Sequence, residues 1–116
     1  MLVAVYGTLK KGERNYAHLL EGKEPLYRSF VELPFAMYAN GEYPMLVPSE
    51  TRCRILVEVF EVDEVELGEL DALEEPYGYW RERVHLREMG KDVEIYLHPA
   101  PAPEGFNFIT SGEWIG

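Results

Sequence analysis

Two carboxylates lie on the inward face of the one helix that the sequence predicts clearly. Two leucines and two acidic residues share the spacing i, i+3, i+4 and i+7, which is one face of a helix: Leu67, Leu70, Asp71 and Glu74. A carboxylate beside core leucines loses hydration, and the negative end of the helix lies nearby. Both effects raise the pKa of a carboxyl group, so that it accepts a proton near neutral pH. Two alternatives stay open: Asp71 bonds to the backbone and orients the turn, or both carboxylates face solvent.

The loop after the first predicted strand is a second candidate site. Residues 2–5 are apolar and rich in β-branched side chains, which favours a strand buried on both faces. The loop that follows consists of Tyr6, Gly7, Thr8 and Leu9. Gly7 permits a positive φ and a close approach to the backbone, and successive loop N–H groups that point one way bind a carboxylate or phosphate. On these residues alone, an ordinary turn is the simpler interpretation.

The other reactive side chains form no recognisable site. His18, His85 and His98 are far apart in the sequence and lack the spacing of metal ligands, so we expect no metal site. Cys53 falls on the apolar face of a predicted strand without a basic neighbour, as a buried structural thiol does. The glycine patterns of nucleotide-binding loops and the serine motif of α/β-hydrolases are absent from the sequence.

The candidate site residues must be positioned by a fold made mostly of strands. Strand-like runs cover residues 26–33, 35–38, 45–47, 52–62, 79–88 and 93–98. The clear helix covers residues 63–75, where Asp63 and Glu66 have the form of a capping box, and a short helical segment is expected within 13–22 after Asn15 as N-cap. Residues 106–109 and 114–115 form an aromatic tail over the core. We therefore predict one α+β domain, residues 1–116, with a mostly antiparallel β-barrel.

Composition restricts the partners that this chain can have. Twenty-one Asp and Glu residues against 11 Lys and Arg give a net charge of −10, which disfavours nucleic acid and anionic membranes and favours small molecules. No segment has the length of a membrane span, and one cysteine allows no internal disulfide, so we expect a cytoplasmic protein. The lack of Gln beside abundant Glu and Arg is typical of thermophilic proteins. Oligomeric state is left open.

Four segments together resemble a known family. They are residues 6–10 (Tyr-Gly-Thr-Leu-Lys), 41–44 (Gly-Glu-Tyr-Pro), 70–81 with Leu-Asp-Ala-Leu-Glu followed by Tyr-Trp-Arg, and 111–114 (Ser-Gly-Glu-Trp). In this order they resemble the motifs of the γ-glutamylcyclotransferase-like group, which includes the AIG2-like proteins. The resemblance spans almost the whole chain, so it is far more specific than any single motif.

This resemblance implies a function as well as a fold. It implies a small β-barrel flanked by helices, with one cavity, and the cyclisation of a γ-glutamyl amine or γ-glutamyl amino acid to 5-oxoproline without metal or cofactor. Enzymes that catalyse this cyclisation are classified as transferases or as lyases. By the same resemblance, the backbone of Tyr6, Gly7, Thr8 and Leu9 holds the γ-glutamyl group. Glu74 is then the general acid/base, and Tyr79 lines the cavity.

One departure from the family pattern keeps alternatives open. The family often has Glu-Gly at the catalytic position, whereas this chain has Glu74, Glu75 and Pro76. Glu75 is therefore an alternative functional carboxylate. Two other functions also fit the sequence: a non-catalytic module that binds a small molecule in the same pocket, and an enzyme acting on another small acidic amide.

Overall fold

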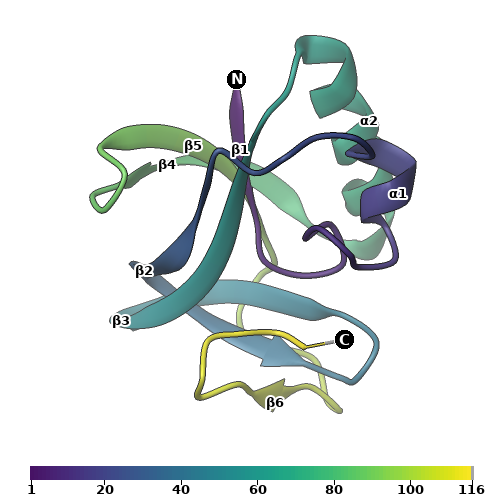
Figure 1. Ribbon diagram of the computed structural model, residues 1–116. Helices are drawn as coiled ribbons and strands as arrows, with labels where there is room; N and C mark the ends of the chain where they lie inside the picture. The colour runs from purple at the N-terminus through teal and green to yellow at the C-terminus, as the bar shows by residue number, and fades with distance from the viewer. Residues whose placement is uncertain (116) are drawn as a thin grey trace.

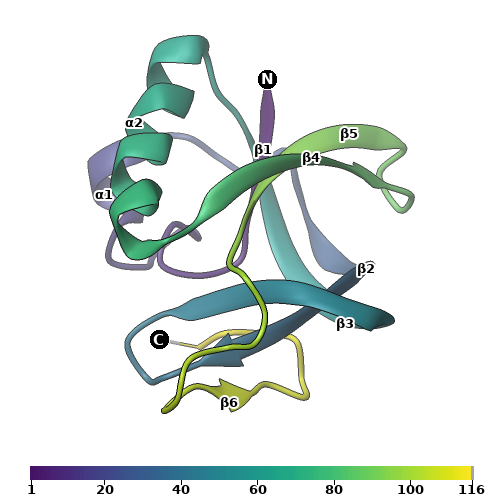
Figure 2. The same ribbon diagram turned by 180° about the vertical axis from the view of Figure 1, so that it is seen from behind.

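One curved sheet carries two helices on one side. A computed structural model describes residues 1–115, without the side chains of residues 17 and 18. In chain order the elements are β1 (Leu2–Val5), α1 (Tyr16–Leu19), β2 (Tyr27–Ala39), β3 (Pro44–Glu61), α2 (Glu64–Glu74), a 3₁₀ turn η1 (Glu75–Tyr77), β4 (Trp80–Leu86), β5 (Lys91–Leu97) and β6 (Asn107–Phe108). The strand order is β4-β5-β1-β3-β2-β6. Figures 1 and 2 show both helices packed together beside β1, on the side away from β6.

The sheet is a half-barrel built around the hairpin of β2 and β3. All strand pairs are antiparallel except β1 with β5. The edge strands β4 and β6 do not pair with each other within residues 1–115, so the curved sheet stays open. This architecture confirms the expected α+β fold with a mostly antiparallel sheet and flanking helices.

Two expected interruptions of the strands are absent. Pro34 does not end a strand, because the register between β2 and β3 shifts between Leu33 and Phe35 and the exposed proline lies at that bulge. The expected strands 45–47 and 52–62 are both parts of the 18-residue strand β3. The predicted breaks were wrong because a bulge and a bend keep the ladder intact where local propensity alone indicates a turn.

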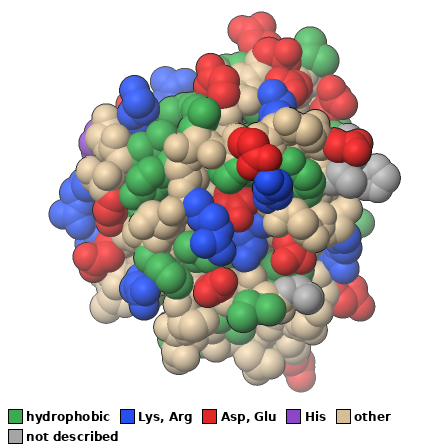
Figure 3. Space-filling view, in the orientation of Figure 1, with side chains coloured by type: hydrophobic (Ala, Val, Ile, Leu, Met, Phe, Trp, Pro, Cys, Tyr) green, Lys and Arg blue, Asp and Glu red, His purple; other side chains and the backbone are tan. Residues whose placement is uncertain are grey.

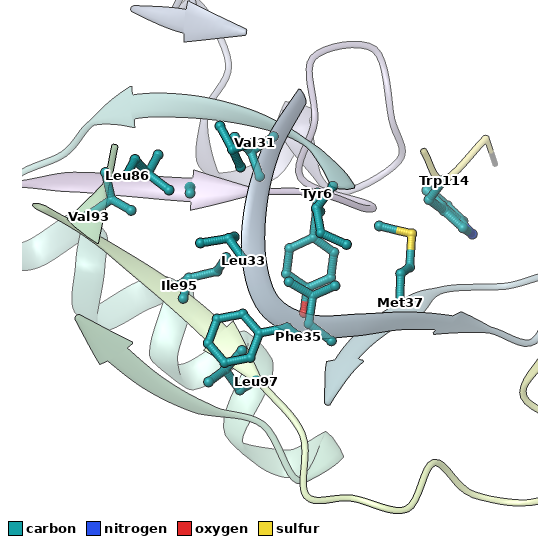
Figure 4. Close-up of a cluster of buried hydrophobic side chains, with 14 of the residues drawn as sticks. Tyr6, Val31, Leu33, Phe35, Met37, Leu86, Val93, Ile95, Leu97 and Trp114 are labelled. Carbon is teal, nitrogen blue, oxygen red and sulfur yellow. The ribbon is translucent and has the colours of Figure 1, made fainter. Parts of the chain in front are cut away.

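Alternation along the strands produces two separate cores. The side chains on the concave face form the first core, which includes Ala4, Tyr6, Ile55, Val57, Val59, Val93, Ile95 and Leu97. Figure 4 shows this cluster between β2 and β5, with Trp114 at one end. The alternate residues Val3, Val5, Phe60 and Tyr96 pack in the second core with Leu67 and Leu70 of α2. Both faces of β1, β3 and β5 are therefore covered, as the apolar run of residues 2–5 predicts for β1.

The C-terminal segment docks on β3. The N–H of Leu56 donates to the carbonyl of Gly112 at 2.8 Å, and Trp114 is buried in the first core. Lys10 is buried as well, and its Nζ donates to the carbonyl of Trp114 at 2.6 Å. Trp114 thus covers the core as expected. Ile115 does not, because 82% of its surface is exposed.

The surface carries both signs of charge. Figure 3 shows acidic and basic side chains interspersed on one face, with acidic ones crowding the upper part of the view, where α2 begins. Glu64 and Glu66 lie in that first helical turn. Among the described residues, no helix has the length and apolar character needed to cross a bilayer.

Candidate active site

A cavity of about 320 Å³ opens where β1 ends. Its walls come from the end of β1 and the loop after it, the turn before β3, the end of α2, the turn η1, Tyr79 just before β4, and β5. The lining residues include Tyr6, Gly7, Thr8, Leu9, Arg14, Asn15, Glu42, Tyr43, Pro44, Leu73, Glu74, Tyr77, Tyr79 and Tyr96. A concave site with many aromatic walls and few charged groups is typical of small-molecule pockets.

Glu74 lies at the cavity wall because α2 is positioned from its first turn. Asp63 and Glu66 form the expected capping box, with Asp63 Oδ1 accepting from the Glu66 N–H at 2.8 Å and Glu66 Oε1 accepting from the Asp63 N–H at 2.9 Å. Leu67 and Leu70 are buried one and two turns later. The helical period then turns Glu74 into the cavity, where burial raises its pKa from 4.5 to about 7. A carboxyl group with this pKa exchanges protons readily near neutral pH.

Asp71 shares the helical face of Glu74 but faces the neighbouring strands. Its Oδ1 accepts from Arg81 Nε at 2.9 Å and from the Tyr96 hydroxyl at 2.6 Å, and its Oδ2 accepts from Arg81 Nη2 at 3.2 Å. Burial acts to raise the pKa of Asp71, but the hydrogen bonds from Arg81 and Tyr96 outweigh burial and lower this pKa. The alternative in which Asp71 bonds to the backbone is wrong, since side chains occupy both of its oxygens.

Glu75 does not line the cavity. It begins the turn η1, where Pro76 follows at a first-turn position, and its side chain is exposed. Gly78 ends the turn with φ near 88°, a conformation that suits glycine, and the chain then enters β4 through Tyr79. The sequence Glu-Glu-Pro therefore separates two neighbouring carboxylates: one in the cavity and one in solvent.

The loop after β1 is fixed in place around Gly7. A Cβ atom on Gly7 would lie 2.5 Å from Cγ of Pro44, so the proline ring leaves no room for a side chain. Gly7 does not use the positive φ that a glycine permits, since the glycines with positive φ are at other positions. Close packing against Pro44 is the reason for this glycine. Asn15 binds Thr8 twice, from its N–H to the carbonyl at 2.9 Å and from Nδ2 to Oγ1 at 2.9 Å.

Asn15 therefore stabilises the loop and not the helix. It occupies the N-cap position of α1, as predicted, but its side chain makes no capping hydrogen bond to the helix. Within the described part of the chain, the N–H groups of Gly7, Thr8 and Leu9 have no protein acceptor. A loop with three such donors at a cavity wall can bind an anion through its backbone.

Three buried tyrosines complete the cavity wall. The hydroxyl of Tyr6 donates to the carbonyl of Tyr96 at 2.7 Å, and that of Tyr79 donates to the carbonyl of Pro44 at 2.7 Å. Burial raises the pKa of Tyr6, Tyr79 and Tyr96 above the ordinary value, so all three remain neutral phenols. They contribute shape and oriented dipoles to the cavity.

The structure brings the predicted residues together and adds others. Glu74, Tyr6, Gly7, Thr8, Leu9 and Tyr79 all line one cavity. Sequence reasoning did not identify Tyr96, because the alternation of β5 indicated Val93, Ile95 and Leu97 as the inward set. α2 covers the second face of β5, and Tyr96 is buried on that face. The sequence did contain a signal for this burial: the neighbouring strand β1 is apolar on both faces, which indicates that the second face of the sheet is also covered.

The other side chains considered for chemistry lie outside this cavity. His85 is exposed and its Nδ1 lies 2.7 Å from Asp92 Oδ1, while His98 Nδ1 lies 3.1 Å from the carbonyl of Pro99. The side chain of His18 lies outside the described part of the chain. Cys53 is a half-buried free thiol that packs against both cores, as a structural thiol does. In the residues that are described, no three His, Cys, Asp or Glu side chains are grouped as metal ligands.

Comparisons with known proteins agree with this geometry. The model of the family described as "Gamma-glutamyl cyclotransferase, AIG2-like" matches residues 3–116. A candidate γ-glutamylcyclotransferase of Methanocaldococcus jannaschii is 34% identical over 97% of this chain and 93% of its own. Among solved structures, an uncharacterised protein of Pyrococcus horikoshii superposes with a TM-score of 0.78, at 27% identity, over 97% of this chain and 88% of its own.

A mammalian structure shares the same fold. The AIG2-like protein of Mus musculus superposes with a TM-score of 0.69 at 25% identity, over 98% of this chain and 87% of its own. The family model covers nearly every residue, and the M. jannaschii relative is similar over almost the full length of both chains. The chain therefore belongs to the AIG2-like γ-glutamylcyclotransferase family.

Proposed function

We propose that this protein is a γ-glutamylcyclotransferase that converts a γ-glutamyl amine or γ-glutamyl amino acid into 5-oxoproline and the free amine, with Glu74 as general acid/base. One observation carries the proposal. Glu74, with a pKa raised to about 7 by burial, shares a cavity with a loop whose three consecutive N–H groups have no acceptor among the described residues. Family membership supports the same reaction class.

The reaction needs one group that first accepts and then returns a proton. The α-ammonium group of the substrate is not nucleophilic until it loses a proton to Glu74. The amine then attacks its own γ-carbonyl carbon, forming a C–N bond and a five-membered ring. Glu74 returns this proton to the leaving nitrogen as the original amide bond breaks, and the extra proton on the ring nitrogen then passes through Glu74 to the released amine, which leaves as an ammonium ion. Because nucleophile and electrophile belong to one molecule, a cavity that holds the substrate folded supplies much of the acceleration.

In this proposal the loop holds the substrate and does no proton chemistry. The N–H groups of Gly7, Thr8 and Leu9 would bind the α-carboxylate or the oxyanion that develops at the γ-carbonyl. Tyr79 would line the substrate pocket, and its buried hydroxyl already donates to Pro44. The rigid contact between Gly7 and the Pro44 ring supports this role, since preorganised donors cost little reorganisation during reaction.

The test separates the two neighbouring glutamates. We expect the protein to release 5-oxoproline from at least one member of a panel of γ-glutamyl amines and amino acids, measured by chromatography. Glu74→Gln should lower kcat by about 10²- to 10⁴-fold, the range of general acid–base catalysis, because an amide cannot accept the proton. Glu75→Gln is the matched control, since Glu75 is exposed and outside the cavity, and should retain near-normal turnover.

Other outcomes would change the proposal in defined ways. Wild-type-like turnover by Glu74→Gln would remove Glu74 from the mechanism, and selective loss in Glu75→Gln would transfer the role to Glu75. Binding of a γ-glutamyl compound by calorimetry, with no turnover across the panel, would instead support a binding module that uses this cavity.

A further inference from the structure

A polar cluster lies one helical turn before Glu74. Asp71 accepts two hydrogen bonds from the guanidinium of Arg81, at 2.9 and 3.2 Å, and one from the Tyr96 hydroxyl at 2.6 Å. Arg81 also pairs with the buried Glu94, which accepts from Arg83 Nε at 3.1 Å. The cluster thus joins α2 to β4 and β5, and none of these contacts is used by the proposed chemistry.

This cluster anchors the part of α2 that apolar packing leaves free. Leu70 is the last fully buried residue of the helix, and Leu73 is only partly buried. Glu74 is the last residue of α2, and helix ends fray unless they are held. Asp71 is the residue between Leu70 and Glu74 with strong partners on another element. Through Tyr96, whose carbonyl accepts from Tyr6, the anchor extends to the end of β1.

The cluster is also balanced in charge. Arg81 and Arg83 carry two positive charges, and Asp71 and Glu94 carry two negative charges. Removing the charge of Asp71 alone leaves one net positive charge beside a wall of the cavity, because Tyr96 contacts Asp71 and lines that wall. A positive charge favours the ionised form of a nearby carboxyl group.

Charged and aromatic side chains from several elements surround Glu74. The charged side chains that line the cavity with it are Arg14, in the loop before α1, and Glu42, in the turn before β3. Tyrosines form much of the cavity wall, and burial raises the pKa of Tyr6, Tyr79 and Tyr96 above the ordinary value, so these three are neutral phenols. His98 packs against the Tyr79 ring, with centroids 5.6 Å apart. Asp71 lies on the same helix, about one turn before Glu74.

We propose that Asp71 is a positioning residue for Glu74, which holds the last turn of α2 against β4 and β5 and neutralises Arg81 beside the cavity. This inference rests on the proposed role of Glu74 as the base. It makes Asp71 necessary for both the place and the protonation of Glu74, although Asp71 itself does not enter the cavity. Replacing Asp71 should therefore shift the pH at which Glu74 titrates in a predictable direction. A loss of packing alone would not produce a shift of predictable direction.

The test reads the titration of Glu74 directly, without substrate. In protein labelled with ¹³C at glutamate side chains, the Glu74 signal is assigned by its absence in Glu74→Gln and followed by NMR from pH 4 to 9.

We expect Asp71→Asn, which keeps the shape but loses the charge, to lower the midpoint by about one pH unit. The double variant Asp71→Asn with Arg81→Met removes both charges and should return the midpoint to the wild-type pH. Glu64→Gln, an equal charge change in the first turn of α2, is the control and should leave it unchanged.

Measurements of turnover then distinguish the effect of Asp71 on the position of Glu74 from the effect of its charge. Tyr96→Phe removes one hydrogen bond to Asp71 without a charge, so kcat should fall while the Glu74 midpoint stays at the wild-type pH. An unchanged midpoint in Asp71→Asn, or no return in the double variant, would overturn the inference. If no γ-glutamyl compound is turned over, the proposed function fails, but the NMR titration still decides whether Asp71 and Arg81 control Glu74.

Discussion

At the scale of single residues, packing explains choices that propensity does not. As a glycine, Gly7 permits a positive φ and a close approach to its backbone, and the structure uses only the close approach, by the ring of Pro44. This contact joins the loop after β1 to the first residue of β3. The Gly-Glu-Tyr-Pro segment and the first loop, distant in sequence, are therefore parts of one cavity wall.

A methyl group at position 7 should disturb both stability and catalysis. Gly7→Ala forces Cβ to within 2.5 Å of Pro44 Cγ, so the loop or the proline ring must move. We expect a loss of about 1 to 3 kcal/mol in the free energy of unfolding, the usual cost of overpacking, together with reduced turnover.

The control for this substitution is Gly68→Ala. Gly68 lies in α2, where an added Cβ meets nothing within 4 Å, so alanine should stabilise the helix by up to about 1 kcal/mol. Urea unfolding of both variants measures these changes. If Gly7→Ala is as stable as the wild type, the loop after β1 adapts to the added methyl group and is not fixed by its contact with Pro44.

At the scale of elements, the C-terminal segment behaves as part of the sheet. Gly112 has a φ of 72° and its carbonyl accepts from Leu56 in β3. A Cβ at this position would lie 1.7 Å from the carbonyl oxygen of Arg54, which is backbone and cannot turn away. The segment that carries Trp114 therefore depends on a glycine for its contact with β3.

Alanine at position 112 should release this segment. We expect Gly112→Ala to lower the free energy of unfolding by more than about 2 kcal/mol, because strain at positive φ is added to a backbone clash. Gly105→Ala is the matched control, since Gly105 has a φ of 91° and open space around it, and should cost only the strain of about 1 kcal/mol. Thermal unfolding followed by Trp fluorescence compares the two. A cost for Gly112→Ala no larger than that for Gly105→Ala would contradict the docking.

At the scale of the whole molecule, the raised pKa of Glu74 must appear in global stability. Its pKa is 4.5 when exposed and about 7 in the folded protein. Because the folded value is the higher one, the stability linked to this group is fully present below about pH 4.5 and is lost as the pH rises through 7. The carboxylate that we propose as the general acid/base is thus expected to destabilise the fold as the pH rises through 7.

Glu74→Gln should therefore stabilise the protein in alkaline solution. Relative to wild type, we expect its free energy of unfolding to increase by about 1 to 2 kcal/mol between pH 5 and pH 8, a value reduced from the full shift because Glu74 is only half-buried. Denaturant unfolding at both pH values measures the difference. Glu75→Gln, on the exposed neighbour, should show no such change, and a pH-independent difference for Glu74→Gln would argue against burial of its charge.

The amino-acid sequence determined the elements and the participants of the site. The capping box at Asp63, the alternation in β3 and the helical spacing that ends at Glu74 are local patterns, so they could be predicted from neighbouring residues alone. The breaks expected at Pro34 and between residues 47 and 52 failed for the same reason, since a long-range partner keeps the strands paired there.

Only the tertiary structure decided which way the two helix carboxylates face. The helical spacing placed Asp71 and Glu74 on one face beside the same leucines, and only the family resemblance assigned the acid/base role to Glu74. Arg81 and Tyr96 reach one of them from β4 and β5, while the other lines the cavity beside Gly7. These contacts join residues far apart in the chain, and the pKa of each carboxyl group depends on them. The sequence therefore specified a pair of candidate acids, and the packing of α2 on the sheet made them different.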